Sequence, residues 1–215
     1  MKDLQRALSP ASQVIVCGST TEGEEEILLA AFREVFRQSP QAVLVLAPRR
    51  PERFEKVALL IEASGLPFQR RSTWTPATPL SGCVFLLDTL GELAPVYAVA
   101  HLAFVGGSLL PGTGGHNILE PAQHGVAVLT GPHTENFREI VRIFSDTADT
   151  KKGPALCVVT LQRIGAEFIR LLRDHDERLR LGQRAQELFQ QNTGATARTL
   201  AAIQKLLAAT SGRTA

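Results

Sequence analysis

The stretch HLAFVGGSLLPGTGGHNILEPAQHGVAVLTG, residues 101–131, contains the pattern that decides the fold. Two short apolar runs, at 102–107 and 126–131, flank a glycine-rich loop and a helix that we expect at 118–125. Continuous apolar runs of this length are typical of strands that helices cover on both faces of a parallel sheet. The stretch therefore predicts a strand–helix–strand unit of an α/β fold.

The same alternation runs through the rest of the chain. Further strands are expected at 13–18, 42–48, 67–72, 83–88 and 155–160, and further helices at 22–38, 51–65, 89–100, 136–144, 162–172 and 176–207. Alternation repeated this often predicts a Rossmann-like parallel sheet with helices on both faces. We assign residues 13–215 to one domain and residues 1–12 to a linker or the remnant of a preceding domain.

The composition argues against several classes of function. The net charge of +2 gives no indication of binding to nucleic acid or to an anionic membrane. No apolar run approaches the roughly 18 residues of a transmembrane helix, and the N-terminus lacks the apolar core of a signal peptide, which favours a cytoplasmic location.

The motifs G-x-G-x-x-G after the first strand, G-x-x-x-x-G-K-[ST], HExxH and CxxC are absent, so we expect no metal and no cofactor. Cys17, Cys83 and Cys157 lie in strand-like runs and are expected to be buried free thiols.

Polar residues follow the first two predicted strands. In CGSTTEGEEEI, Ser19 or Thr20 is expected to cap the next helix and to line a cleft, unless the segment is only a capped helix with a solvated acidic face. In LAPRRPERF, the strand ends at Pro48 and Arg49 follows at once. Guanidinium groups there would point into a ligand crevice and suit phosphate, or they are exposed on a turn. We expect Arg53 on the helix surface.

Two further junctions carry candidate ligand groups. In LLDTLGEL, the turn Gly91–Leu93 offers backbone amides for an oxyanion or a base edge, unless Asp88 only caps the helix. In the glycine-rich loop, Asn117 is expected to cap the next helix, whose first turn would face an anion. Glu120 would accept hydrogen bonds from sugar hydroxyls or only compensate the helix dipole. His116 would either order the loop or contact a ligand.

Five collinear stretches carry a resemblance to a known family. They are CGSTTEGEEEILL, APRRPERFEKV, DTLGELAPVYAVAHLAFVGGSL, GGHNILEPAQHGVAVLTGPHTENFREI and QNTGATARTL, and they cover most of residues 13–200. Together they resemble the C-terminal half of the bacterial 3-deoxy-D-manno-octulosonic acid (Kdo) transferases, which have the two-domain GT-B fold. The chain departs from the usual family pattern at Thr21 and Arg50, where the family usually has histidine, and the loop after Ser108 is one residue longer.

The resemblance implies a site for CMP-Kdo. The matching positions are Pro48, Arg49, Gly91, Glu92, Leu93, Asn117, Ile118, Leu119 and Glu120, and the junctions described above add Ser19, Thr20 and Gly115. Arg49 and the amides near Asn117 would stabilise the leaving phosphate, so no metal is required in principle. Glu92 and Glu120 would position the nucleotide, with Glu120 at the ribose.

The resemblance also implies what this chain lacks. In the family, a hydroxyl of a lipid A precursor attacks Kdo with inversion, and an N-terminal domain holds that acceptor and the general base. The full-length enzyme is peripheral to the inner membrane, at its cytoplasmic face. We therefore expect a donor-binding domain without transfer activity of its own. A GT-B domain that uses a UDP-sugar and a stand-alone nucleotide-binding module without catalysis remain alternatives.

Overall fold

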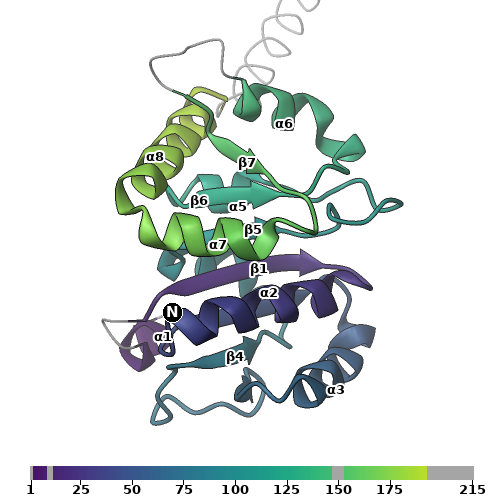
Figure 1. Cartoon of the computed structure of the whole chain (residues 1–215), viewed down its shortest axis with the longest axis vertical. Coiled ribbons are helices and arrows are strands. Elements are labelled where there is room, and N and C mark those ends of the chain that lie inside the picture. Colours follow the sequence, from purple (N-terminus) through teal and green to yellow (C-terminus); the bar gives the residue numbers. More distant parts are fainter. Residues whose placement is uncertain (1, 9–11, 147–152, 193–215) are drawn as a thin grey trace, which may run out of the picture.

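A seven-stranded, all-parallel sheet forms the centre of the molecule (Figure 1). The computed structural model describes residues 2–8, 12–146 and 153–192. The strand order is β3-β4-β2-β1-β5-β6-β7. The strands are β1 (Val14–Thr20), β2 (Val43–Pro48), β3 (Phe68–Arg70), β4 (Cys83–Leu86), β5 (Leu102–Val105), β6 (Ala127–Thr130) and β7 (Leu156–Val158). All seven predicted strands and the predicted fold class are confirmed.

The helices follow the predicted alternation, with differences at several ends. They are α1 (Lys2–Ala7), α2 (Glu24–Gln38), η1 (Pro51–Arg53), α3 (Phe54–Ser64), α4 (Leu93–Val96), η2 (Tyr97–Val99), α5 (Leu119–Ala122), η3 (Glu135–Phe137), α6 (Arg138–Ser145), α7 (Ile164–Arg173) and α8 (His175–Asn192). The helix α1 was not predicted and lies in the segment assigned as a linker. The predicted terminal helical region beyond 192, with most of the QNTGATARTL stretch, lies outside the described residues.

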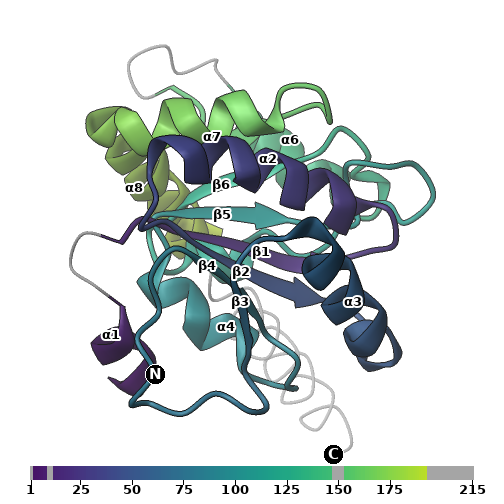
Figure 2. The ribbon, with the colours of Figure 1, turned by 60° about the horizontal axis from the view of Figure 1, so that its bottom comes forward.

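Helices cover both faces of the sheet (Figure 2). Alternate residues of β1 point to opposite faces, as a strand requires. Ile15 and Cys17 pack in one cluster with apolar residues of α2, α3 and α7, whereas Val14 and Val16 pack in another with residues of α1, α4 and η2. A third cluster joins α5, α6 and α8 to β5–β7. Two-sided burial explains why these strands read as continuous apolar runs.

The cysteines and the helices bear on two further predictions. Cys17 and Cys83 are buried free thiols as predicted, whereas Cys157 is only half-buried because it lies on the edge strand β7. Among the residues that the structure describes, no helix has both the length and the apolar character that a membrane crossing requires.

The sheet topology creates a crevice beside β1. From β1 the chain moves to β2 on one side and later returns to β5 on the other side, so the strand order reverses at the β1–β5 boundary. In open α/β sheets, ligands bind outside the carboxyl ends of the strands at such a reversal. A ligand site is therefore expected among the loops after β1, β2 and β5.

Close packing at the end of β1 requires a glycine at position 18. A Cβ atom there would lie 2.0 Å from Tyr97 Oη and 3.1 Å from Leu93 Cδ1. We expect Gly18→Ala to lower the free energy of unfolding by about 1–3 kcal/mol, because the buried Tyr97 ring has to shift. Urea unfolding measures the effect. In a Tyr97→Phe background the same substitution should cost less, and an equal cost in both backgrounds would contradict this account.

Candidate functional site

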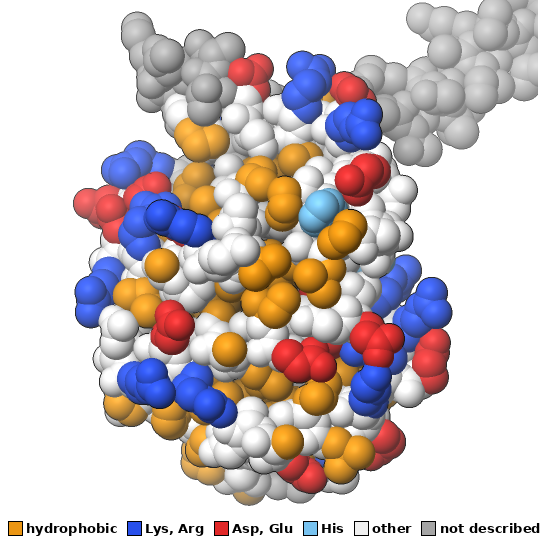
Figure 3. Space-filling model, turned by 45° about the vertical axis from the view of Figure 1, so that its right-hand side comes forward, with side chains coloured by type: hydrophobic (Ala, Val, Ile, Leu, Met, Phe, Trp, Pro, Cys, Tyr) orange, Lys and Arg blue, Asp and Glu red, His pale blue; other side chains and the backbone are white. Residues whose placement is uncertain are grey.

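An open pocket of about 500 Å³ lies at the ends of β1, β2 and β5. It is lined by Thr20, Thr21, Glu22, Arg49, Arg50, Arg53, Leu110, Pro111, Thr113 and His116. Figure 3 turns the strand ends of Figure 1 toward the viewer; apolar side chains gather in the middle of this face and charged groups lie around them. The pocket therefore occupies the crevice that the topology predicts.

The three arginines of the pocket differ in their partners. Arg53 is paired with Glu25, and Arg50 lies 3.8 Å from the exposed Glu52. Arg49 makes no ion pair with any carboxylate of the described residues, and its backbone N–H donates to Thr20 O at 2.9 Å. The backbone of Arg49 is thus anchored to the end of β1, while its exposed guanidinium is available to an anion.

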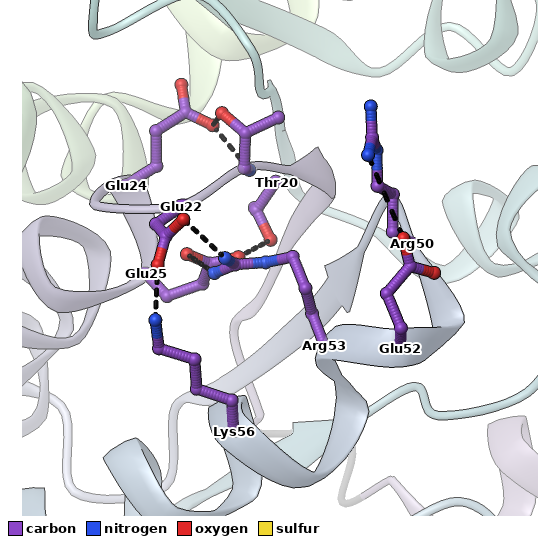
Figure 4. A network of polar contacts seen from close by, with 9 residues as sticks. Thr20, Glu22, Glu24, Glu25, Arg50, Glu52, Arg53 and Lys56 are labelled. Atoms are coloured by element: carbon purple, nitrogen blue, oxygen red, sulfur yellow. Dashed lines mark hydrogen bonds and ion pairs between the residues drawn. The ribbon is translucent and has the colours of Figure 1, made fainter.

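A buried ion pair links the loop after β2 to the first turn of α2 (Figure 4). Arg53 Nη2 donates to Glu25 Oε2 at 2.8 Å; the Glu25 side chain is fully buried and that of Arg53 is 13% exposed. Thr20 Oγ1 donates to the other carboxylate oxygen at 3.0 Å. Burial raises the pKa of Glu25, against the opposing effects of hydrogen bonds and the Arg53 charge. The expectation that Arg53 lies on the helix surface is therefore wrong. Its side chain is mostly buried because it forms an ion pair with the Glu25 carboxylate.

The predicted cap of α2 is wrong. The N-cap residue is Gly23, with φ 87°, and neither Ser19 nor Thr20 caps the helix. Thr20 belongs to β1 and contacts Glu25, and Ser19 has a left-handed φ of 56° at a register shift between β1 and β2. The strand continues past this shift to Thr20, two residues beyond its expected end, and the helix begins only at Glu24. Ser19 and Thr20 therefore lie in the strand and not at the N-cap position.

The carboxylate of Glu24 holds the loop that follows β5. Its oxygens accept from Gly107 N at 2.7 Å and from Ser108 N and Leu109 N at 2.9 Å each. They also accept from the backbone N and the hydroxyl of Thr21 at 2.9 and 3.1 Å. Glu24 is 0% exposed. The alternative of a solvated acidic face is therefore wrong for both Glu24 and Glu25.

Internal hydrogen bonds close the glycine-rich loop. Gly115 N donates to Gly107 O at 2.7 Å, and Asn136 Nδ2 donates to Thr113 O at 2.7 Å. Because the Gly115 amide is already engaged, its expected contact with a ligand phosphate would have to replace this bond. Gly115 has φ 80°, a left-handed backbone that favours glycine.

His116 lies between the loop and the pocket. A Cβ atom on Gly107 would lie 2.7 Å from the imidazole Cδ2, so the ring rests on this glycine. The buried Nε2 atom has no hydrogen-bond partner among the described residues. Burial and then the charge of Arg49 lower the pKa of His116, and the charge of Glu24 opposes them. The net effect favours the neutral form of the imidazole.

The predicted cap of the next helix is wrong: α5 begins at Leu119 and its N-cap residue is Ile118, not Asn117. Asn117 Oδ1 instead accepts from Leu119 N at 3.1 Å in the turn before the helix. Burial raises the pKa of Tyr97, and the charge of Glu120 raises it further. The Glu120 carboxylate is therefore close enough to Tyr97 for its charge to act on the phenol.

The Gly91–Leu93 turn differs from its prediction. The helix α4 begins only at Leu93, and Asp88 does not cap it: this buried carboxylate accepts from Ser72 N and Arg70 Nε at 2.8 Å each. Glu92 Oε1 accepts from Arg71 Nη2 at 2.7 Å and lines a separate cavity of about 100 Å³ with Trp74.

The structure brings some predicted site residues together and separates others. Thr20 and Arg49 line the main pocket, with Pro48 buried next to Arg49. Glu92 lies on the wall of the smaller cavity, and the Leu93 side chain lies near Gly18. Sequence reasoning missed the roles of Glu24, Glu25 and Arg53. The only available indication was three successive glutamates after a glycine. No group of three or more metal-ligating side chains occurs among the described residues.

Comparisons with known proteins place these features in a family. No family model matches the chain. The 3-deoxy-D-manno-octulosonic acid transferase of Haemophilus influenzae is 38% identical over 86% of this chain and 42% of its own length. The crystal structure of the C-terminal CMP-Kdo binding domain of WaaA from Acinetobacter baumannii has 31% identity and a TM-score of 0.77, with 88% of this chain and 99% of that chain covered. HepE from Anabaena, solved with UDP, has 16% identity and a TM-score of 0.58 over 94% of this chain and 53% of that chain, a likeness of fold alone.

The parallel sheet, with its pocket at the strand ends, is that of the C-terminal domain of a GT-B glycosyltransferase. More specifically, the chain belongs to the Kdo transferase family and corresponds to the C-terminal domain of its members. It spans less than half the length of the Haemophilus influenzae relative.

The buried Arg53–Glu25 pair predicts a pH-dependent loss of stability. We expect Arg53→Met to cost about 3–5 kcal/mol near neutral pH, because it leaves a buried carboxylate without its counter-charge. Without Arg53 the already raised pKa of Glu25 rises further. The folded variant then retains a proton that the unfolded chain releases, so its stability should fall as pH rises through the raised pKa. Urea unfolding at pH 5 and pH 8 measures this.

The matched control for this prediction is Lys56→Met. Lys56 pairs with Glu22 on the surface, where both side chains are more than half exposed. Its loss should leave the free energy of unfolding nearly unchanged at both pH values. Equal effects of the two substitutions would show that burial of the Glu25 pair does not matter.

Proposed function

We propose that this chain is the donor-binding domain of a Kdo transferase and that its pocket holds CMP-Kdo. The observation that carries the proposal is Arg49, a guanidinium without a carboxylate partner among the described residues, at the strand reversal where ligands of this fold bind. The 31% identity to a CMP-Kdo binding domain over nearly the whole of that domain supports it. The donor phosphate would then lie against Arg49.

Of the remaining predicted contacts, we assign the turn from Asn117 to Glu120 to the same donor site, whereas Glu92 lies on the wall of a separate cavity. Asn117 Oδ1 accepts from Leu119 N and so orders the turn that carries Ile118 to Glu120. Glu120, which is half-exposed, would accept hydrogen bonds from the ribose. Glu92 accepts from Arg71 and from Thr89, which hold the turn Gly91–Leu93 in place. Through this turn Glu92 would help to position the nucleotide.

The chemistry follows from where charge develops. A hydroxyl of the acceptor attacks the anomeric carbon of Kdo while the bond to CMP breaks, so negative charge grows on the leaving phosphate. A guanidinium hydrogen-bonded to that phosphate stabilises this charge more strongly in the transition state than in the ground state. Arg49 supplies the guanidinium.

The acceptor and the membrane belong to the same proposal. We assign the lipid A precursor and the general base to an N-terminal domain of the full-length enzyme, which would work at the cytoplasmic face of the inner membrane. This chain alone should therefore bind CMP-Kdo without transferring Kdo. Detectable transfer to a lipid A precursor by the isolated chain would contradict this assignment.

Calorimetric titration with CMP and UMP tests the donor site. We expect CMP to bind in preference to UMP, and Arg49→Ala to weaken CMP binding roughly 10- to 100-fold, because a hydrogen bond to a charged phosphate is lost. Glu120→Ala should weaken it as well. Arg37→Ala removes the same charge from an exposed position on α2, outside the pocket, and should leave the affinity unchanged.

Other outcomes of this titration would favour the alternatives. A preference for UMP would indicate that the donor is a UDP-sugar. HepE, a neighbour in fold, was solved in complex with UDP-glucose. CMP binding that is equally strong in Arg49→Ala would move the site away from this pocket. CMP affinity with no transfer even when an acceptor domain is supplied would favour a nucleotide-binding module without catalysis.

A further inference from the structure

The loop after β5 begins with three successive backbone amides that point at one place. The N–H groups of Gly107, Ser108 and Leu109 converge on the Glu24 carboxylate at 2.7–2.9 Å. Such a concave run of amides is a favourable site for an anion. In this chain an internal carboxylate fills the site, and it is fully buried. These amides are therefore not available to a bound phosphate.

The two glycines at the end of β5 leave room for this arrangement. A Cβ atom on Gly106 would lie 2.8 Å from Glu24 Oε2. A Cβ atom on Gly107 would meet the His116 ring. Gly107 O in turn accepts from Gly115 N at 2.7 Å, next to His116 in the chain. A continuous set of contacts thus runs from Glu24 through Gly107 to a side chain that lines the pocket.

We propose that Glu24 is the positioning residue of the donor site: it acts as an internal anion that holds the β5 loop and His116 in their binding geometry, and it leaves the donor phosphate to Arg49. This inference rests on the proposed function for its ligand. It extends that function in two ways. The loop amides bind the protein's own Glu24 carboxylate, and the phosphate of the donor is bound by the Arg49 guanidinium instead. Glu24 acts through the loop and does not touch the donor.

A carboxylate is the group that this role requires. Glu24 accepts five hydrogen bonds on its two oxygens, three from the loop and two from Thr21. A glutamine has one acceptor oxygen and places an NH₂ donor where at least two donors already point. Alanine leaves the amides and the Thr21 hydroxyl unsatisfied, with a space the size of a small carboxylate.

Chemical rescue tests the proposal. We expect Glu24→Ala to bind CMP ~10-fold more weakly or worse, because loop contacts to a charged group are lost. Sodium formate should restore much of that affinity by filling the vacated amide site, whereas sodium chloride at equal ionic strength should not. Glu24→Gln should lose affinity and gain nothing from formate, since its amide still occupies the space.

The matched control is Glu26→Gln. Glu26 lies in the same turn of α2 but is exposed, and it makes no contact with the β5 loop. Its substitution removes the same charge and should leave the CMP affinity and the response to formate as in the unsubstituted protein. Thermal unfolding of each variant shows whether it is folded. If Glu24→Ala is not folded, Glu24→Gln provides the measurement.

A readout that needs no nucleotide separates this proposal from the proposed function. Amide hydrogen exchange and nuclear magnetic resonance of Gly107, Leu109 and the His116 imidazole report on the loop directly. We expect ~10-fold faster exchange at both amides, and a shifted imidazole resonance, in Glu24→Gln but not in Glu26→Gln. This should hold even if the unsubstituted chain fails to bind CMP, an outcome that would overturn the proposed function alone.

Two results would overturn the positioning role itself. One is a folded Glu24→Gln whose loop amides exchange as in the unsubstituted protein. The other is a folded Glu24→Ala whose lost CMP affinity formate does not restore at tens of millimolar, with the loop amides also unresponsive to formate.

Discussion

One buried carboxylate, Glu24, is the contact on which the binding edge of this domain depends. It joins the first turn of α2 to the loop after β5, two segments that are more than 80 residues apart in the sequence. A buried carboxylate is costly unless hydrogen bonds satisfy it, and here five donors converge on it. The loop amides in turn need the carboxylate, because three buried N–H groups would be left without acceptors if the Glu24 side chain were lost.

Glu25, the next residue, holds the loop on the opposite side of β1. Glu25 contacts Arg53 after β2 and Thr20 at the end of β1. Because β1 lies between β2 and β5, the first turn of α2 stands above the crevice and can hold both bordering loops. Two successive glutamates thus fix the two walls of the pocket independently. The scaffold of the site is ionic and hydrogen-bonded through side chains, whereas the sheet beneath it is held by the backbone hydrogen bonds of its strands and by apolar side-chain packing on both faces.

The sequence allowed the sheet to be predicted much better than the site. Each strand lies within two residues of its expected ends, because two-sided burial makes a strand an uninterrupted apolar run. Thr20 and Arg49 were expected at the crevice because strand ends meet there. The roles of Glu24, Glu25 and Asp88 were missed because their partners are distant in sequence, and an acidic residue near a helix start has the same local pattern whether it is solvated or buried. The helix α1 was missed because its six residues show too little periodicity.

The disposition of charge in the pocket follows from this scaffold. Glu24 and Glu25 lie close to the crevice, and as free carboxylates they would repel an anionic ligand. The loop amides hydrogen-bond to the first carboxylate and Arg53 forms an ion pair with the second, so the protein's own donors already stabilise both. Arg49 lacks a carboxylate partner among the described residues, and its positive charge is the one left for a ligand. The backbone of Arg49 is already anchored to the end of β1, so only its side chain has to be ordered when a phosphate arrives.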